Sequence, residues 1–199
     1  MKKLIFNPFT KIAGTKALII GLSIIILSAL LCYPTNTHFD GVLDIHFSGA
    51  NNIYIHLIEG ITNLISIVFI FSLTVLIIVG AKFRFIDLLG TMSLSRAPLI
   101  IIPIFSLILP LQKMNDYFTY TYSKIGTPVE IGYWDIISFI VFSLIIIFVI
   151  IWTITLMYNA FRICMNVKGA KAVASFVTGL LLAEVLSKVV FYYFINPIS

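Results

Sequence analysis

The sequence predicts an all-α integral membrane protein, a bundle of five transmembrane helices with its N-terminus inside the cell and its C-terminus outside. Two observations predict this fold class. Of the 199 residues, 60% are hydrophobic and only 11% are charged, whereas a soluble domain usually carries about a quarter charged residues. Long apolar runs also alternate with short polar segments, and about 20 apolar residues suffice to cross a hydrocarbon core of about 30 Å. We expect one membrane domain over residues 1–199.

Five apolar runs are predicted to span the membrane: 17–33, 61–80, 97–111, 136–157 and 172–195. The third run is the shortest, about 22 Å long at 1.5 Å per residue, and it holds three prolines. Pro98 lies where a helix can start and Pro110 where one can end, and Pro103 is expected to bend the helix between them. The third span is therefore predicted to be kinked by proline.

The lysine and arginine residues predict the orientation. With five spans, ten of the thirteen fall in the inner segments, Arg96 among them, while Lys113 and Lys124 are outside and Lys188 is in the last span. If the third run only dipped into the membrane, the imbalance would shrink to nine against three. Cytoplasmic segments carry an excess of basic residues, so five full spans are favoured. The bacterial inner membrane is the expected location.

The last span carries two charged residues, Glu184 and Lys188. Their spacing of four places them on one helix face, where they can neutralise each other. One interpretation makes them an ion or proton site in a small transporter or channel. The other makes them a structural pair, and it is favoured because proton relays usually involve a second acid within the membrane.

The same span repeats a small residue at every fourth position: Ser175, Gly179, Ala183 and Ser187. Such a stripe allows another helix to approach closely. It predicts helix packing, either within the chain or with a second copy or another membrane protein.

The outer loop between the first two spans reads HFDGVLDIH over residues 38–46. If the loop is extended, its period of two puts His38, Asp40, Asp44 and His46 on one face, and two imidazoles with two carboxylates could bind a divalent metal such as zinc. The Asp-Gly dipeptide is also a strong turn signal, so a polar hairpin that binds no metal is the alternative.

Other chemistry is not indicated. The sequence holds no HExxH, GxSxG or P-loop motif, so we expect a protein that is not an enzyme and uses no cofactor. It holds no basic stripe with interleaved aromatic residues, which argues against a nucleic-acid partner. The lipid bilayer is the expected environment.

Three segments resemble the bacterial branch of the Yip family, the membrane domain named for proteins that interact with Ypt/Rab GTPases. They are Asn7-Pro8-Phe9, FRFIDLLGTMSLSRAP (83–98) and NAFRICMNVKGAKA (159–172). The resemblance implies five helices, a cytosolic N-terminus, no catalytic residues and a role in membrane organisation or trafficking. Eukaryotic members carry a long cytosolic N-terminal segment and act with small GTPases. Fewer than twenty residues precede the first predicted span here, so GTPase binding is not expected.

Overall fold

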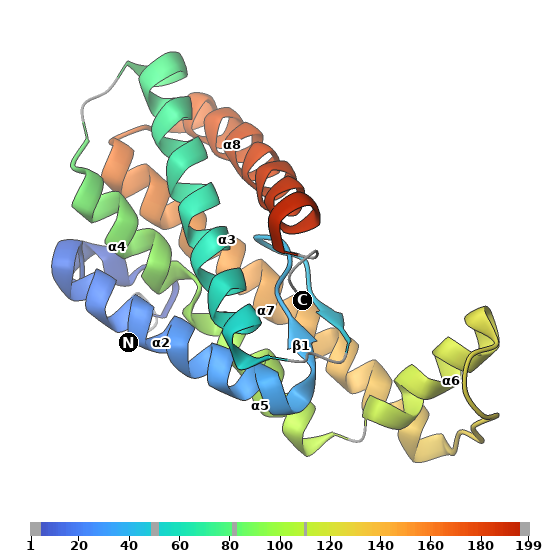
Figure 1. Cartoon of the computed structure of the whole chain (residues 1–199). Coiled ribbons are helices and arrows are strands. Elements are labelled where there is room, and N and C mark those ends of the chain that lie inside the picture. The colour runs from blue at the N-terminus through green and yellow to red at the C-terminus, as the bar shows by residue number, and fades with distance from the viewer. Residues whose placement is uncertain (1–4, 49–51, 81–82, 110, 196–199) are drawn as a thin grey trace.

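The computed structural model describes residues 5–48, 52–80, 83–109 and 111–195. Five helical segments in it are long and apolar enough to cross a membrane, and they pack side by side in one bundle (Figure 1). The predicted all-α bundle of five membrane-spanning helices is confirmed. The five spans are Gly14–Thr35, Ile53–Ile77, Phe85–Ile108, Tyr133–Met165 and Gly169–Phe194.

The helices, in chain order, are α2 (Gly14–Thr35), α3 (Ile53–Thr74), α4 (Phe85–Ser95), α5 (Ile101–Ile108), α6 (Leu111–Ser123), α7 (Tyr133–Met165) and α8 (Gly169–Val190). Short helical turns lie at Pro8–Thr10, Val75–Val79, Ala97–Ile100 and Phe191–Ile195. Two antiparallel strands, β1 (Thr37–His38) and β2 (His46–Phe47), form a hairpin between α2 and α3, with His38 paired to His46.

The third span begins at Phe85 and not near residue 97, which corrects the predicted boundary. The segment from Phe85 to Arg96 contains too many polar residues to be predicted as a membrane helix, but its hydroxyl groups form hydrogen bonds within the same helix. Thr91, Ser93 and Ser95 donate hydrogen bonds of 2.7–2.8 Å to carbonyls three or four residues earlier, and all three side chains are fully buried. Small residues that bond to their own helix can thus lie inside a membrane bundle.

The irregularity of the third span lies at Pro98. There α4 gives way to a 3₁₀ turn with Pro98 in its first turn, and α5 begins at Ile101. Pro103 falls in the first turn of α5, where a missing N–H breaks no helical hydrogen bond. The kink therefore precedes Pro103, and Pro110 lies outside the described residues.

The revised boundary also places Arg96 within the membrane. It lies halfway along the third span and is only 4% exposed, whereas the sequence analysis counted it among the inner residues. The basic residues then number nine inside and two outside. The asymmetry that predicts the orientation is reduced only slightly.

The first and third spans are in close backbone contact. A Cβ atom added to Gly90 would lie 2.2 Å from the carbonyl oxygen of Gly14, and one added to Gly21 would lie 2.5 Å from the backbone nitrogen of Leu94. Without a hydrophobic driving force between helices in lipid, van der Waals packing of this kind holds spans together. The two glycines therefore lie at the crossing of α2 and α4.

The small-residue stripe of α8 packs against α3 of the same chain. All four of its residues are buried, and a Cβ atom on Gly179 would gain a contact of 2.7 Å with the Phe71 ring. Phe71 in turn packs against Phe161 and Phe176, with ring centroids 5.0 and 5.6 Å apart. Of the two packing modes that the sequence left open, the structure shows the one within the chain.

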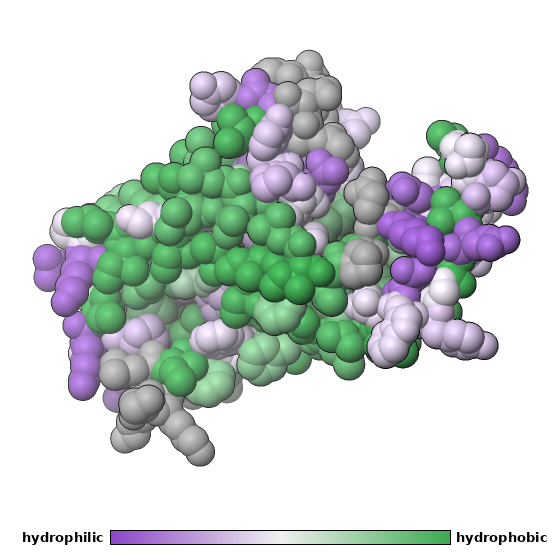
Figure 2. Space-filling model, turned by 90° about the horizontal axis from the view of Figure 1, so that it is seen from below, coloured by the Kyte–Doolittle hydropathy of each residue, from purple (hydrophilic) through white to green (hydrophobic). Residues whose placement is uncertain are grey.

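The surface matches a membrane environment. On the face seen in Figure 2, apolar side chains form a broad band and strongly hydrophilic residues gather toward its two ends. The helix α7 has 33 residues and is therefore about 50 Å long, more than the hydrocarbon core of about 30 Å. Its N-terminal end and α6 extend away from the other helices (Figure 1).

Candidate metal centre

The hairpin between α2 and α3 folds into the bundle instead of projecting from it. Val42 at its tip is 1% exposed. The carbonyl of Val42 accepts a hydrogen bond of 3.1 Å from the guanidinium of Arg96, and the N–H of Leu43 donates one of 2.9 Å to Glu184. Side chains of the third and fifth spans thus anchor the hairpin tip.

The second span supplies a polar face that the sequence analysis missed. Its helix begins at Ile53 and not at residue 61, because the side chain of Asn52 caps it by accepting a hydrogen bond from a backbone N–H. His56, Glu59 and Asn63 then share one face of α3, and all three are buried. Histidine and glutamate three residues apart, directly before an apolar run, were the signal that could have revealed this face.

Two of these residues hold the backbone of the hairpin. Glu59 Oε2 accepts a hydrogen bond of 3.1 Å from the N–H of Phe39, and the amide of Asn63 donates one of 2.6 Å to the carbonyl of Phe39. Both polar backbone groups of Phe39 are therefore paired with α3. This contact fixes the preceding residue, His38, beside Glu59.

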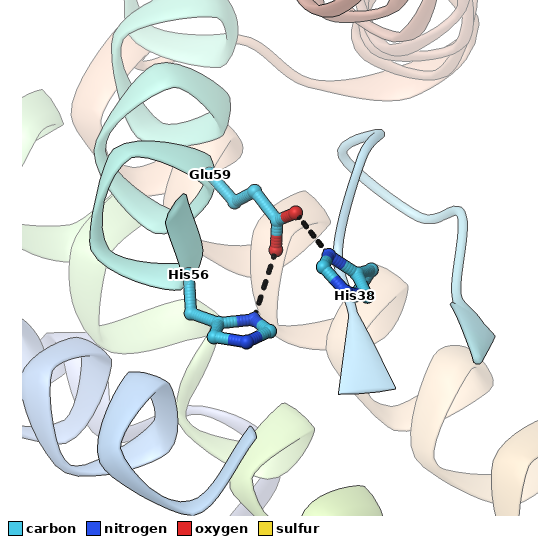
Figure 3. A group of neighbouring side chains, drawn as sticks. All are labelled: His38, His56 and Glu59. Carbon is cyan, nitrogen blue, oxygen red and sulfur yellow. Dashed lines mark hydrogen bonds and ion pairs between the residues drawn. The ribbon is translucent and has the colours of Figure 1, made fainter. Parts of the chain in front are cut away.

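His38, His56 and Glu59 converge into one buried cluster (Figure 3). Nδ1 of His38 lies 2.6 Å from Oε1 of Glu59, and Nδ1 of His56 lies 3.5 Å from Oε2. One ligand atom from each residue lies within 4.8 Å of the others. A tetrahedral zinc ion with bonds of about 2.0–2.1 Å requires ligand atoms about 3.3 Å apart. The separation at His56 is close to that value, whereas His38 and Glu59 are in direct hydrogen-bond contact and would have to move apart by about 0.7 Å to hold an ion.

Both ring nitrogens of His38 lie within hydrogen-bonding distance of an oxygen atom. Its Nε2 lies 3.1 Å from the carbonyl oxygen of Ser48, which can only accept, so Nε2 carries a proton. In a neutral imidazole, Nδ1 would then present a lone pair to a carboxylate oxygen 2.6 Å away. The separation of 2.6 Å is that of a direct hydrogen bond, so a proton lies between the two atoms, and a metal ion could replace it only if they moved apart. A ring N–H donated to a backbone carbonyl is also how metal-binding histidines are usually oriented.

His56 contacts Glu59 at an ion-pair distance but makes no hydrogen bond within the described structure. Neither ring nitrogen makes a hydrogen bond to any residue that the structure describes, although the residue is only 3% exposed. Its 3.5 Å separation from Glu59 is too long for a good hydrogen bond. Leaving a buried polar group unpaired costs about 1–3 kcal/mol, so this imidazole is suited to receiving a ligand.

A small cavity adjoins the cluster. It has a volume of about 20 Å³, and His56, Ser28 and Arg96 are among its lining residues. Most of the lining residues are apolar, but a cavity of this size with a few polar groups in its wall can hold one water molecule. Sites for small-molecule substrates usually measure about 300–1,000 Å³, so this cavity is too small for an organic substrate.

The structure does not gather the four metal ligands predicted from the outer loop. His38 joins the cluster, and its ring stacks on that of His46 with centroids 5.0 Å apart. Nδ1 of His46 lies 3.2 Å from Oδ1 of Asp40. This contact raises the pKa of His46 and lowers that of Asp40, so both groups favour their charged forms and pair with each other. Asp44 binds Lys188 instead.

The reason lies in the backbone of the hairpin. Alternation of side chains with a period of two holds only in extended strands, and the two strands here are two residues long each. Residues 41–43 bend between them. The turn expected from the Asp-Gly dipeptide thus replaces the single extended face.

The two charged residues of the last span are also bound by the hairpin. Nζ of Lys188 donates to Asp44, while Glu184 accepts from the backbone N–H of Leu43. A Cβ atom on Gly41 would lie 2.2 Å from Oε1 of Glu184 and 2.8 Å from Cβ of Asp44, so the lack of a side chain at Gly41 makes room for Glu184 at the hairpin. Their spacing along the helix predicts that Glu184 and Lys188 neutralise each other, whereas in the structure each of them contacts the hairpin.

Comparison with protein-family models, with curated proteins and with solved structures gives no match for this chain. The geometry of the His38–His56–Glu59 cluster is therefore the strongest guide to its function.

Proposed function

We propose that this multi-pass membrane protein binds a divalent transition-metal ion, best matched by zinc, through His38, His56 and Glu59. The observation that carries the proposal is the pair of imidazole nitrogens facing one buried carboxylate, one at 2.6 Å and the other, without a hydrogen-bond partner among the described residues, at 3.5 Å. Two histidines and a glutamate form a known zinc ligand set. An ion at this position would satisfy His56 and neutralise Glu59.

Metal binding here would connect two elements of the fold. His38 comes from β1, and the other two ligands come from α3, so a bound ion would fasten the hairpin to the second span. Three protein ligands leave a fourth coordination position for a water molecule. We propose reversible metal binding without catalysis, because the adjoining cavity of about 20 Å³ admits no substrate.

The test is the metal content of protein purified in detergent without metal-affinity resin and then dialysed against zinc. We expect one equivalent of zinc by elemental mass spectrometry, and we expect His56→Gln and Glu59→Gln to lose it. His46→Gln is the matched control, because His46 stacks on His38 yet lies outside the cluster. Zinc at 100 times its Kd should also stabilise the wild type by about 2.7 kcal/mol.

Two results would contradict this proposal. Wild-type protein that binds no divalent metal at neutral pH would leave a hydrogen-bonded cluster in which a proton holds His38 to Glu59. Loss of zinc in His46→Gln, with retention in His56→Gln, would instead support the ligand set predicted from the outer loop.

On the basis of the family resemblance, we propose a wider role for the protein. It would be a non-enzymatic Yip-type protein that acts in membrane organisation or trafficking through helix packing with itself or with a membrane partner. The segments that resemble the family support it, at residues 7–9, 83–98 and 159–172. Co-purification from mild detergent followed by mass spectrometry would identify a partner, and recovery of the chain alone would count against this role.

The proposed orientation has the N-terminus inside and the C-terminus outside the bacterial inner membrane. The basic residues support it, with nine on the proposed inner side and two on the outer. In a variant without native cysteines, an impermeant thiol reagent added to intact cells should label a cysteine at position 124 and not one at position 168. Labelling of the cysteine at position 168 from outside would contradict the proposed orientation.

A further inference from the structure

A basic cavity of about 230 Å³ lies far from the candidate metal centre. The hairpin contacts α7 through Phe142, which packs against Phe47, whereas the cavity lies near Arg162, about 30 Å farther along the same helix at 1.5 Å per residue. Its lining residues are Asn7, Asn159, Arg162, Ile163, Asn166, Val167 and Lys168.

Two segments that are distant in the sequence form this cavity. The N-terminal segment is held against α7 by two hydrogen bonds: the indole of Trp152 donates to the carbonyl of Ile5 at 3.0 Å, and the amide of Asn159 donates to that of Phe6 at 2.8 Å. Asn7 therefore reaches the turn between α7 and α8. These two segments both belong to the motifs that resemble the Yip family, and the metal centre uses neither.

The lining is cationic and polar. Arg162 and Lys168 supply two positive charges, three asparagine side chains supply amides, and no carboxylate is among the lining residues. The ion pairs between described residues do not involve either cation, and the molecule's eight acids all lie within the described ranges. Arg162 instead rests 5.5 Å from the centre of the Tyr158 ring. Both positive charges therefore remain available to an anion.

The start of α8 adds to this positive potential. Its N-cap residue, Lys168, makes no capping hydrogen bond through its side chain. The first N–H groups of a helix lack partners within the helix, and its dipole places a partial positive charge at this end. The N-terminus of α8 and the side chains of Arg162 and Lys168 therefore all favour a negatively charged ligand.

The position of the cavity relative to the two spans indicates which class of anion it binds. It lies at the short turn joining two spans, Tyr133–Met165 and Gly169–Phe194, and such a turn reaches the depth of the lipid phosphates. Basic pockets between transmembrane helices bind anionic headgroups. Oδ1 of Asn7, which also lines the cavity, is buried without a hydrogen-bond partner in the described chain, and a hydroxyl of a glycerol headgroup could donate to it.

We propose that this cavity binds the phosphate headgroup of an anionic phospholipid such as phosphatidylglycerol. The proposal is independent of the metal centre, because the two sites share no residue.

The test measures binding of phosphatidylglycerol and phosphatidylcholine to the detergent-solubilised full chain by native mass spectrometry. Each of Arg162→Gln and Lys168→Gln should weaken phosphatidylglycerol binding about five-fold, from about 1 kcal/mol per basic residue near an anionic lipid. Phosphatidylcholine should bind weakly to every variant. Lys171→Gln is the matched control, because Lys171 is an exposed lysine in the first turn of α8 that does not line the cavity.

Three results would overturn the proposal. Equal loss of binding in Lys171→Gln would show a diffuse surface attraction. Unchanged binding in a variant carrying both substitutions would exclude the cavity as the site. Equal competition by millimolar inorganic phosphate would identify a free phosphate compound as the ligand. The thermal unfolding midpoint of each variant, measured without lipid, should equal that of the wild type, which separates lost binding from lost folding.

Discussion

Alanine at Gly21 or Gly90 should destabilise the protein, although alanine is the better helix former. The new Cβ atom would lie 2.2 Å from the carbonyl oxygen of Gly14 in Gly90→Ala and 2.5 Å from the backbone nitrogen of Leu94 in Gly21→Ala. Ordinary van der Waals contact begins at 3.4 Å, so α2 and α4 would have to separate by roughly 1 Å at their crossing. A backbone atom cannot rotate away as a side chain can.

Two opposing effects determine how much stability each alanine variant loses. Overpacking costs about 1–3 kcal/mol, and replacing a glycine inside a helix by alanine returns about 0.5–1 kcal/mol. Because the obstacle is backbone, the upper half of the first range applies, and the net loss should be about 1–2 kcal/mol. For a protein of this size, that corresponds to a fall in Tm of about 2–8 °C.

Gly60→Ala is the matched control. Its Cβ atom would approach only Cγ2 of Ile25, at 2.7 Å, a side-chain methyl group that can move without displacing the backbone of α2. We expect a smaller loss of stability than in the other two variants, because the gain in helix propensity offsets much of the strain. Thermal unfolding in detergent, followed by circular dichroism, measures all three variants. Stabilisation of Gly21→Ala and Gly90→Ala by helix propensity alone would refute the close contact between α2 and α4.

Three further predictions test the packing and the charges. Gly179→Leu should lower the Tm because its side chain would collide with the α3 interface, whereas Leu182→Ala, at a position 50% exposed, should have little effect; the reverse order would show that α8 presents its other face. A double-mutant cycle should find a coupling of about 0.2–1 kcal/mol between Lys188 and Asp44, the range for exposed ion pairs. Coupling near zero is expected between Lys188 and Glu184, and a larger value there would restore the pairing predicted from the sequence. A zinc chelator should lower the Tm of the wild type, and an unchanged Tm would contradict the role of the ion in fastening the hairpin.

The fold class and the number of spans were readable from the sequence because the bilayer acts locally. A span must be apolar over a length set by the hydrocarbon core, and each run carries that requirement in its own residues. Boundaries were harder to predict where polar residues are satisfied within the bundle. The segment from Phe85 to Arg96 was read as an inner loop because its hydroxyls look solvent-exposed, whereas they bond to carbonyls of their own helix.

The candidate sites depend on contacts between distant segments. The outer-loop pattern predicts His38 as a metal ligand, but the residues that it meets lie 18 and 21 positions farther along, at His56 and Glu59. They meet it only because Glu59 and Asn63 hold the backbone of Phe39 against α3. Nothing in the local pattern of residues 38–46 indicates that contact.

The sequence by itself thus determined that the chain lies in a membrane, how many times it crosses, and which residue types are available for charge pairing. Only the tertiary structure decided the partner of each polar group. Lys188 could be paired with Glu184 from helical spacing alone, yet it binds Asp44, because the hairpin tip enters the bundle and offers a carboxylate that spacing cannot reveal. Helical periodicity describes neighbours within one element, whereas the partner of a buried charge is chosen by whichever distant segment packs against it.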